Sequence, residues 1–474
     1  MNRVSCAFVL SLAAILPCDA QLGSPPTGRC RFVFENTPNT SVVSVQLPSK
    51  QYNSFLGKGV RARCPEQRIV LISDSLEVYG DEGRFYFVGH VDYREPRLQL
   101  KSDFLTYFQK EERLLAALNV DAKMFPSGST LKGPQLEFFR AIPKVRPKQH
   151  GVALGRPTIS LIEKDAKGKV QPPVNVTGNT IWLEGDSIVA ASGEVLVVRP
   201  ELTATGDSLY LDGGQGLLRI MRQPKIRGTK GRPFTLVGGT IDLLSRRRKL
   251  ERVIANGAGE AVSEDLNLKA DTIDLRVTDD LLQRAIAWGK SRARATSPSQ
   301  AITGDSIDVL MPGQRVRLLH AVRAAMTEGA PDTTTFRTSE KDKLTGDTIV
   351  AHFDSIPASD TSKKPRIRQL IALGKATSYQ HLPPQDTASR LPAINYVTGQ
   401  VITVTFDSAK VHDVKVVGQV SGITIEPHSD STKKAAPAPA RVPPSVPANK
   451  PATPPTIPPA TLPASPTATP PRRP

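Results

Sequence analysis

The sequence predicts an all-β protein built from a repeated antiparallel unit, followed by a disordered, proline-rich C-terminal tail. Three observations lead to this fold class. Apolar and polar residues alternate over short runs bounded by turn-forming residues, which is typical of strands rather than helices. The pattern recurs along the chain, mostly at intervals of about 30 residues, as in stacked repeat architectures. Residues 429–474 consist largely of Pro, Ala and Thr with Lys and Arg, and have too little apolar surface to form a core.

Residues 1–20 are expected to be a secretory signal peptide. Arg3 supplies the positive charge, residues 7–16 form an apolar run too short to span a bilayer, and Cys18-Asp19-Ala20 is an acceptable cleavage site. We therefore expect an exported, periplasmic protein whose mature form starts near Gln21. Two alternatives stay open: association with the inner or outer membrane, and acylation of Cys18 as in a lipoprotein, although the preceding Pro17 fits that signal poorly.

Cys30 and Cys64 are the cysteines that remain after removal of the signal peptide. An even pair in an oxidising compartment favours a disulfide. A metal or redox pair fits less well, because the spacing is wide and no Cys-x-x-Cys or nearby His accompanies it. The disulfide is expected to tie the N-terminal segment, residues 21–68, to the first repeat.

Residues 69–141 repeat one pattern three times. Polar pairs at Ser73-Asp74, Ser102-Asp103 and Gly133-Pro134 are expected to be turns that open strands. Charged or Gly-containing turns at residues 81–83 and 110–112 should lead into the return strands.

Residues 142–180 are rich in Pro, Lys, Gly and Val. We expect a long inserted loop that contains one strand pair around Thr158–Ile162. The sequence leaves open whether this segment separates two β blocks or decorates a single one.

The repeats resume over residues 181–428. The pattern reads EGDSIVA from Glu184, TGDSLYL from Thr205, TGDSIDVL from Thr303 and TGDTIVAHF from Thr345. Each copy is interpreted as a turn, because Gly tolerates positive φ and the Asp side chain caps turns. The same four residues at Gly206–Leu209 also spell the motif of one lipase family, but a nucleophile would not recur once per repeat.

Nothing else in the sequence indicates catalysis or a cofactor. Gly289-Lys290-Ser291 lacks the glycine that a phosphate-binding loop requires where Arg284 stands, and the seven His show no metal-ligand spacing. We therefore expect no enzyme activity, no catalytic residue, no metal and no cofactor. The net charge of +17 is typical of nucleic-acid binding. The export signal argues against that partner and favours anionic lipid.

From about residue 69 to residue 427, these degenerate copies of turn, Asp, Ser or Thr, and strand resemble the OstA-like family. That family includes the LptA-like and LptC-like lipopolysaccharide-transport bridge proteins and the N-terminal part of LptD-like proteins. The resemblance implies an antiparallel β-taco, or β-jellyroll, with an apolar interior groove for acyl chains. It implies as partners lipopolysaccharide or another amphipathic envelope lipid, other envelope-bridge proteins, and a second copy in end-to-end self-association.

Counted from each expected turn, alternate apolar residues should point to one face of the sheet. The resemblance makes that face the lipid groove, and the candidate residues are Leu76, Val78, Ile188, Leu209, Leu211, Ile241, Leu243, Ile273, Leu275, Ile307, Val309, Ile349, Phe353, Ile402 and Val404. The expected function is non-catalytic lipopolysaccharide transport and outer-membrane assembly. A packed β core would show the same alternation. The alternative is therefore a structural or scaffold protein of the cell envelope, with a closed core and a tethering tail.

Overall fold

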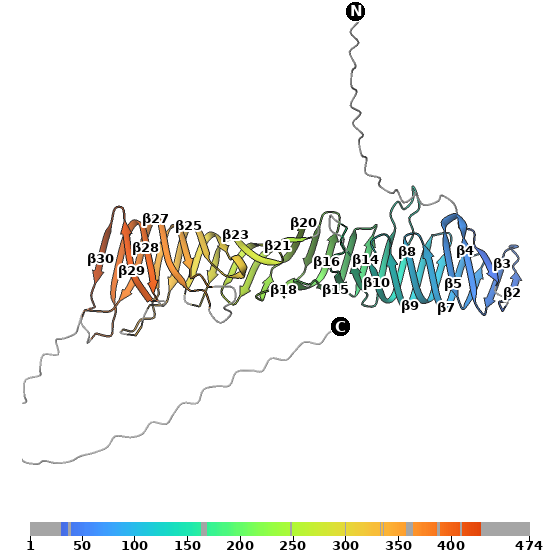
Figure 1. Cartoon of the computed structure of the whole chain (residues 1–474), viewed down its shortest axis with the longest axis horizontal. Coiled ribbons are helices and arrows are strands. Elements are labelled where there is room, and N and C mark those ends of the chain that lie inside the picture. The colour runs from blue at the N-terminus through green and yellow to red at the C-terminus, as the bar shows by residue number, and fades with distance from the viewer. Residues whose placement is uncertain are drawn as a thin grey trace, which may run out of the picture. The chain divides into compact units, whose positions relative to one another are not determined.

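The computed structural model describes residues 30–427, apart from 37–38, 163–167, 247–248, 299, 332, 335, 357–363, 386–388 and 408–409. The expected signal peptide with Cys18, the cleavage site and the expected tail at 429–474 lie outside the described residues. Within them the prediction of an all-β, repetitive antiparallel fold is confirmed. In this described part of the chain, thirty strands join in one antiparallel sheet, with short 3-10 turns at Pro65–Gln67 and Pro312–Gln314. The strands follow one another nearly in chain order, from β2 and β3 to β28–β30 (Figure 1).

The sheet is folded lengthwise into two walls, wall A and wall B, whose apolar faces share one core. Wall A alone contains β2 (Ser41–Gln46), β3 (Tyr52–Gly57), β6 (Ser75–Tyr79), β11 (His150–Leu154), β14 (Thr180–Glu184), β17 (Leu217–Met221), β20 (Thr240–Arg246) and β29 (Lys410–Val417). Wall B alone contains β1 (Val33–Asn36), β4 (Val60–Cys64), β5 (Ile69–Ser73), β12 (Thr158–Leu161), β13 (Val174–Thr177), β18 (Lys225–Gly228), β19 (Phe234–Val237) and β30 (Ser421–Ile425).

The long strands run through both walls. They are β7 (Arg84–Glu95), β8 (Leu98–Phe108), β9 (Arg113–Met124), β10 (Thr130–Phe139), β15 (Ile188–Val198), β16 (Leu202–Asp212), β21 (Lys249–Ser263), β22 (Asn267–Thr278), β23 (Leu281–Thr296), β24 (Gln300–Leu310), β25 (Leu318–Gly329), β26 (Asp342–Phe353), β27 (Ile367–Leu382) and β28 (Ala393–Asp407). We call the line along which they bend the corner, and the opposite side, where the hairpins of the two walls face each other, the mouth.

The bend at the corner has two alternating forms. In β7, Gly89 and His90 both take positive φ, at 78° and 46°. In the neighbouring β8, Asp103 stands at a shift in strand register. Consecutive positive-φ residues recur at 118–119 in β9, 193–194 in β15, 257–258 in β21, 323–324 in β25 and 374–375 in β27, whereas β23 bends over residues 289–292 without them. Extra residues of this kind form β-bulges, which bend a strand and re-aim its side chains.

The prediction of a turn is right for the repeated segment at residues 185–187, which is a hairpin turn, and wrong for the other three. Asp207, Asp305 and Asp347 lie inside β16, β24 and β26, at the corner. The same is true of Ser102-Asp103 in β8 and Gly133-Pro134 in β10. Gly and Asp suit both a hairpin and a bulge, because both need unusual backbone angles and local side-chain hydrogen bonds.

Residues 142–180 also differ from the prediction of an inserted loop with one strand pair. The expected pair is present as β12 and β13, but β11 lies in the same segment. β11 pairs with β10 and with β14. β12 pairs with β10, and β13 pairs with β15. The segment therefore continues both walls, and the repeats on either side belong to one sheet. Its Gly and Pro residues interrupt strands at the corner and the mouth without ending the sheet.

Candidate functional site

The predicted groove residues lie mostly inside the folded sheet. Of the fifteen candidates, Val78 packs partly buried against the core and Ile188 points outward, and the others are buried, with Leu211 the most exposed of these at 9%. Ile241, Ile273, Ile307, Ile349 and Ile402 are fully shielded by other side chains. At these positions the interior is a packed core rather than an empty groove.

The prediction that Ile188 points inward is wrong by one residue. Its neighbours Val189 and Ala191 are the buried residues of β15. Residues 185–187 form a hairpin turn between β14 and β15. Because β15 starts directly after this turn, Val189 and Ala191 point inward and Ile188 points outward. A one-residue step in a strand moves a side chain to the other face of the sheet.

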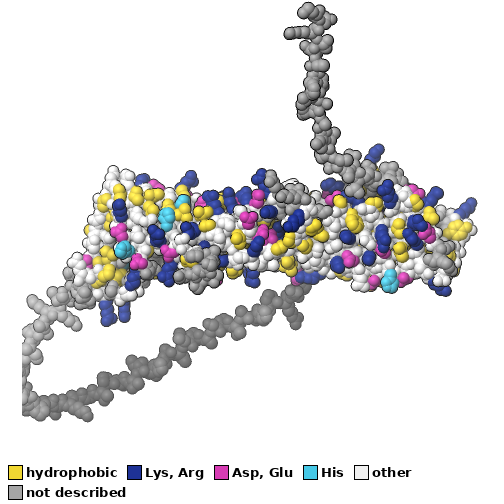
Figure 2. All heavy atoms as spheres, in the orientation of Figure 1, with side chains coloured by type: hydrophobic (Ala, Val, Ile, Leu, Met, Phe, Trp, Pro, Cys, Tyr) yellow, Lys and Arg dark blue, Asp and Glu magenta, His cyan; other side chains and the backbone are white. Residues whose placement is uncertain are grey.

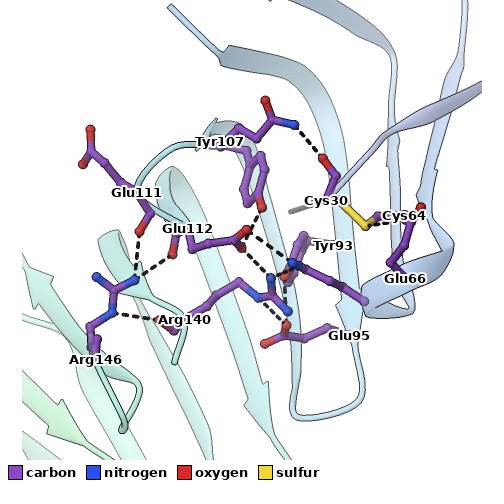
Figure 3. A network of polar contacts seen from close by, with 12 residues as sticks. Cys30, Cys64, Glu66, Tyr93, Glu95, Tyr107, Glu111, Glu112, Arg140 and Arg146 are labelled. Carbon is purple, nitrogen blue, oxygen red and sulfur yellow. Dashed lines mark hydrogen bonds and ion pairs between the residues drawn. A yellow bond between two sulfur atoms is a disulfide. The ribbon is translucent and has the colours of Figure 1, made fainter. Parts of the chain in front are cut away.

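A buried ion-pair network joins the two walls across the mouth in the N-terminal part (Figure 3). Arg140 follows β10 in wall A, and its Nε donates to Glu95 of wall B at 2.7 Å. Its Nη1 donates to Glu112 of wall A at 2.7 Å and to Gln67 of wall B. The side chains of Arg140, Glu95 and Glu112 are 12%, 7% and 13% exposed. Charges this buried are stable only when they are paired and hydrogen-bonded.

Two tyrosines complete this network from inside the core. Tyr107 donates to Glu112 at 2.8 Å and Tyr93 donates to Glu95 at 3.1 Å. Burial, together with the nearby carboxylates, raises the pKa of both phenols well above the usual value. Burial opposes the charge on Arg140, but interactions with the tyrosines and glutamates outweigh it and raise the pKa of the guanidinium.

Further contacts close the mouth beyond the Arg140 network. Arg97 of wall B pairs with Asp186 of wall A, and Lys230 of wall B pairs with Asp280 of wall A at 2.7 Å. The Gln314 side chain accepts a hydrogen bond from the Arg232 backbone N–H at 2.6 Å. We call these contacts and the Arg140 network the clasps. Where both partners belong to the part of the chain that the structure describes, the contacts across the mouth lie between Cys30 and Gln314.

The disulfide expected between Cys30 and Cys64 is present, and it fixes the segment before β1 to the end of β4. The Cys30 carbonyl accepts a hydrogen bond at 2.5 Å from the side chain of Gln109, which belongs to wall A. The disulfide therefore stabilises the same end of the mouth as the Arg140 network (Figure 3).

A cavity of about 1280 Å³ lies between the walls in the C-terminal part. Wall A supplies Phe353, Leu370, Val404 and Phe406, and wall B supplies Leu344. Two of the predicted groove residues, Phe353 and Val404, thus line open space. A much smaller cavity of about 40 Å³ is lined in part by a third, Leu275.

The lining of the large cavity is apolar inside and charged toward the mouth. Exposed cationic residues Lys343, Lys364 and Arg366 border it. A partly open cavity with a largely apolar lining and charged groups at one side matches the general form of a site for an amphipathic ligand.

His381 is one of the buried polar residues of the cavity wall, together with Thr327 and Gln380. Its side chain is 2% exposed, and its Nδ1 lies 2.8 Å from Asp342. Its Nε2 lies 3.6 Å from Glu340, which also accepts a hydrogen bond from Tyr379 at 2.7 Å. That hydrogen bond, followed by the nearby imidazole, lowers the pKa of Glu340. The imidazole and its acceptors fix the position of β26 against β27 beside the cavity.

The sequence analysis missed the clasps and most of the cavity. Arg140, Glu95 and Glu112 carry no local motif, since they lie up to 45 residues apart and meet only when the mouth closes. Phe406 continues the alternation of Ile402 and Val404, which could have identified it. Ile367 and Leu370 stand at the start of β27, where the strand register shifts.

Comparison with known proteins adds no family to this description: no family model and no curated protein matches the chain. Among the described residues, no group of three or more His, Cys, Asp or Glu side chains is placed to hold a metal ion. Nor does that part of the chain contain a helix long and apolar enough to cross a membrane.

Proposed function

We propose that this protein binds an amphipathic envelope lipid of the lipopolysaccharide type in the C-terminal cavity and takes part in its transport. The observation that carries the proposal is the cavity of about 1280 Å³ between two apolar sheet faces. The expected export signal and the resemblance to the OstA-like repeats support the same proposal. No step of this function requires a catalytic group.

The chemistry of the cavity suits such a ligand. Each buried methylene of an acyl chain gains about 0.8 kcal/mol, so one chain enclosed by Leu370, Val404 and Phe406 would be held firmly. Phosphate or carboxylate groups of the same lipid would meet Lys364 and Arg366 toward the mouth. Other bridge proteins and a second copy of the chain are the partners proposed for passing the lipid on.

The scaffold alternative is supported by a different observation. From Cys30 to Val309 the core is built of fully or nearly fully buried side chains, and clasps hold the mouth shut. A protein that served only as an envelope spacer would need this closed core and no cavity ligand.

Photo-crosslinking distinguishes the two functions. A benzophenone amino acid in place of Val404, which faces the cavity, should capture lipid in cells. The same residue in place of Thr405 should not, because successive strand residues point to opposite faces. The Ile307 position, in the packed core, serves as a third site where we expect little capture.

Leu370→Asp should abolish capture at position 404, because an unpaired carboxylate would lie on an apolar wall. Mass spectrometry of lipids that co-purify with the protein identifies the ligand. Equal capture at 404 and 405, or no capture at either while circular dichroism shows a folded protein, would overturn the lipid proposal and favour the scaffold.

A further inference from the structure

Wall A carries a row of outward-facing side chains next to the corner, and its composition changes along the sheet. The row can be followed from strand to strand through the pairing register. From β14 to β22 it is polar apart from Met221, with Thr180, Ser192, Ser208, Thr240, Asn256 and Thr272. The fold therefore does not require apolar side chains in this row.

From β23 onward the same row becomes mainly apolar. Ser306 and Thr348 occupy β24 and β26, and the remaining strands form what we call the apolar stripe, which is Trp288, Val322, Leu373, Val401 and Val417. Trp288, Val322, Leu373 and Val417 are 39%, 38%, 38% and 50% exposed. Adjacent strands lie about 4.8 Å apart, so the stripe extends roughly 30 Å across the outside of wall A.

Three further apolar residues widen the stripe. Ile286 and Ile371 lie two residues before the row on β23 and β27, and Val350 lies two residues after it on β26, all on the same face of wall A. All three are partly exposed. Ser306 and Thr348 interrupt the stripe, and Asp308 and His320 lie between Ile286 and Val350, but Val350, Ile371, Leu373, Val401 and Val417 lie on neighbouring strands. A group of exposed apolar residues marks an interaction site more often than scattered single residues do.

Cationic side chains border the stripe at the corner. Lys290 and Arg292 lie in the bulge after Trp288, Arg323 follows Val322, and Lys375 follows Leu373 by two residues. All four are exposed, and Lys290, Arg323 and Lys375 form no ion pair with a described carboxylate. Asp305 and Asp347 stand on the strands between them, and Asp271 of β22 lies near Lys290. Figure 2 shows Lys and Arg side chains distributed over the visible face of the sheet, with Asp and Glu among them.

We propose that the apolar stripe and its bordering cations dock wall A onto the surface of an anionic lipid bilayer. Trp beside exposed aliphatic residues is typical of groups that enter the membrane interface, and neighbouring Lys and Arg favour anionic headgroups. This surface lies on the outside of the sheet, so it is separate from the lipid cavity between the walls. It would hold the C-terminal part of the sheet against the membrane whether or not the cavity is filled.

Vesicle flotation tests the docking surface with the purified chain. Vesicles that contain phosphatidylglycerol should carry the protein, and vesicles of phosphatidylcholine alone should carry much less. Replacing Val322, Leu373 and Val417 together by Thr, the residue type of the polar part of the row, should weaken binding about tenfold or more. Leu154→Thr, on the same row in β11 and 40% exposed, is the matched control and should leave binding unchanged.

Tryptophan emission reports the orientation. The chain has two Trp, so Trp182→Phe leaves Trp288 as the reporter, and its emission should shift to shorter wavelength on phosphatidylglycerol vesicles. Lys290→Gln, Arg323→Gln and Lys375→Gln together should remove the preference for these vesicles. Flotation of neither vesicle type, equal loss in the Leu154→Thr control, or an unchanged Trp288 emission in the bound protein would overturn the proposal, and would favour a protein partner for the stripe.

Discussion

The clasped part of the sheet, residues 60–315, and the hollow part, residues 318–417, share one backbone plan but differ inside. Both consist of antiparallel strands that bend at the same corner and bury alternate side chains. The first has a mostly filled interior, with one cavity of about 40 Å³, and its mouth is bridged by the buried Arg140 network and by exposed ion pairs. The second has a partly open cavity of about 1280 Å³ between its walls. Whether this folded sheet becomes a core or a container is therefore decided by side chains.

Large side chains fill the N-terminal end of the clasped part, where Phe87, Tyr93 and Tyr107 are fully buried between the walls. Buried alanines do not distinguish the two parts. They occur in both, and Ala321, Ala351 and Ala372 of the hollow part do not line the cavity. The cavity is bordered instead by residues near the strand ends at the mouth, such as Thr327, Phe353 and Leu382.

The largest test of this comparison removes the central clasp. Arg140→Met should cost about 3–5 kcal/mol of unfolding free energy, because Glu95 and Glu112 are left buried without a cation. Urea denaturation measures the loss. Arg97→Met is the matched control, since its pair with Asp186 is 47% and 56% exposed, and exposed pairs contribute about 0–1 kcal/mol. Similar losses in both variants would show that the buried network does not hold the walls together.

The disulfide should have the next largest effect. Cys30→Ala with Cys64→Ala should lower the unfolding free energy by about 3–4 kcal/mol, because the unfolded chain regains the freedom of a 34-residue loop. Thermal and urea denaturation of the oxidised wild type and the double variant measure this. A variant as stable as the wild type would show that the Arg140 network alone fixes this end of the mouth.

A matched pair of truncations compares the two interiors directly. Ile307→Ala removes a fully buried side chain from the packed core and should cost about 2–5 kcal/mol, since it creates a new void. Ile367→Ala borders the cavity and should cost about 1–2 kcal/mol, because empty space is already present beside it. Equal losses of unfolding free energy in the two variants, measured by urea denaturation, would contradict the distinction between a filled and a hollow part.

The smallest expected effect is a pH dependence that belongs to the clasped part. The pKa values of Tyr93 and Tyr107 are raised in the folded protein. Their contribution to stability is therefore fully present below about pH 10, the unfolded pKa, and is lost as pH rises above it. Between pH 9 and pH 10.5, the variant with Phe at both positions should lose about 1–2 kcal/mol less than the wild type. If the unfolding free energies of the wild type and the variant change equally with pH, neither phenol stays protonated in the fold.

Much of the fold follows from local patterns in the sequence. The alternation at Ile273 and Leu275, or at Ile307 and Val309, identifies buried faces correctly because a strand has a period of two wherever one face is covered. The pattern fails at Ile188, where a hairpin replaces a bulge. Gly-Asp-Ser is compatible with either, and only the pairing of neighbouring strands decides between them.

The candidate site was less predictable because it depends on distant residues. No local signal distinguishes Arg140, which closes the mouth, from the many exposed arginines of this basic chain. The cavity likewise depends on the combined volume of side chains from two walls. Alternation shows that Ala351 and Phe353 point inward, but it does not show how much of the space between the walls their partners fill.

The alternating bends at the corner limit how such a chain can change in length. A strand with two positive-φ residues, such as β7, always lies beside one with a register-shifting polar residue, such as β8. Inserting a single strand would place two bends of the same kind side by side and reverse the direction of the chain that follows. Gene duplication or deletion that preserves this fold should therefore add or remove strands in adjacent pairs, so that the hairpin is the unit of evolutionary growth.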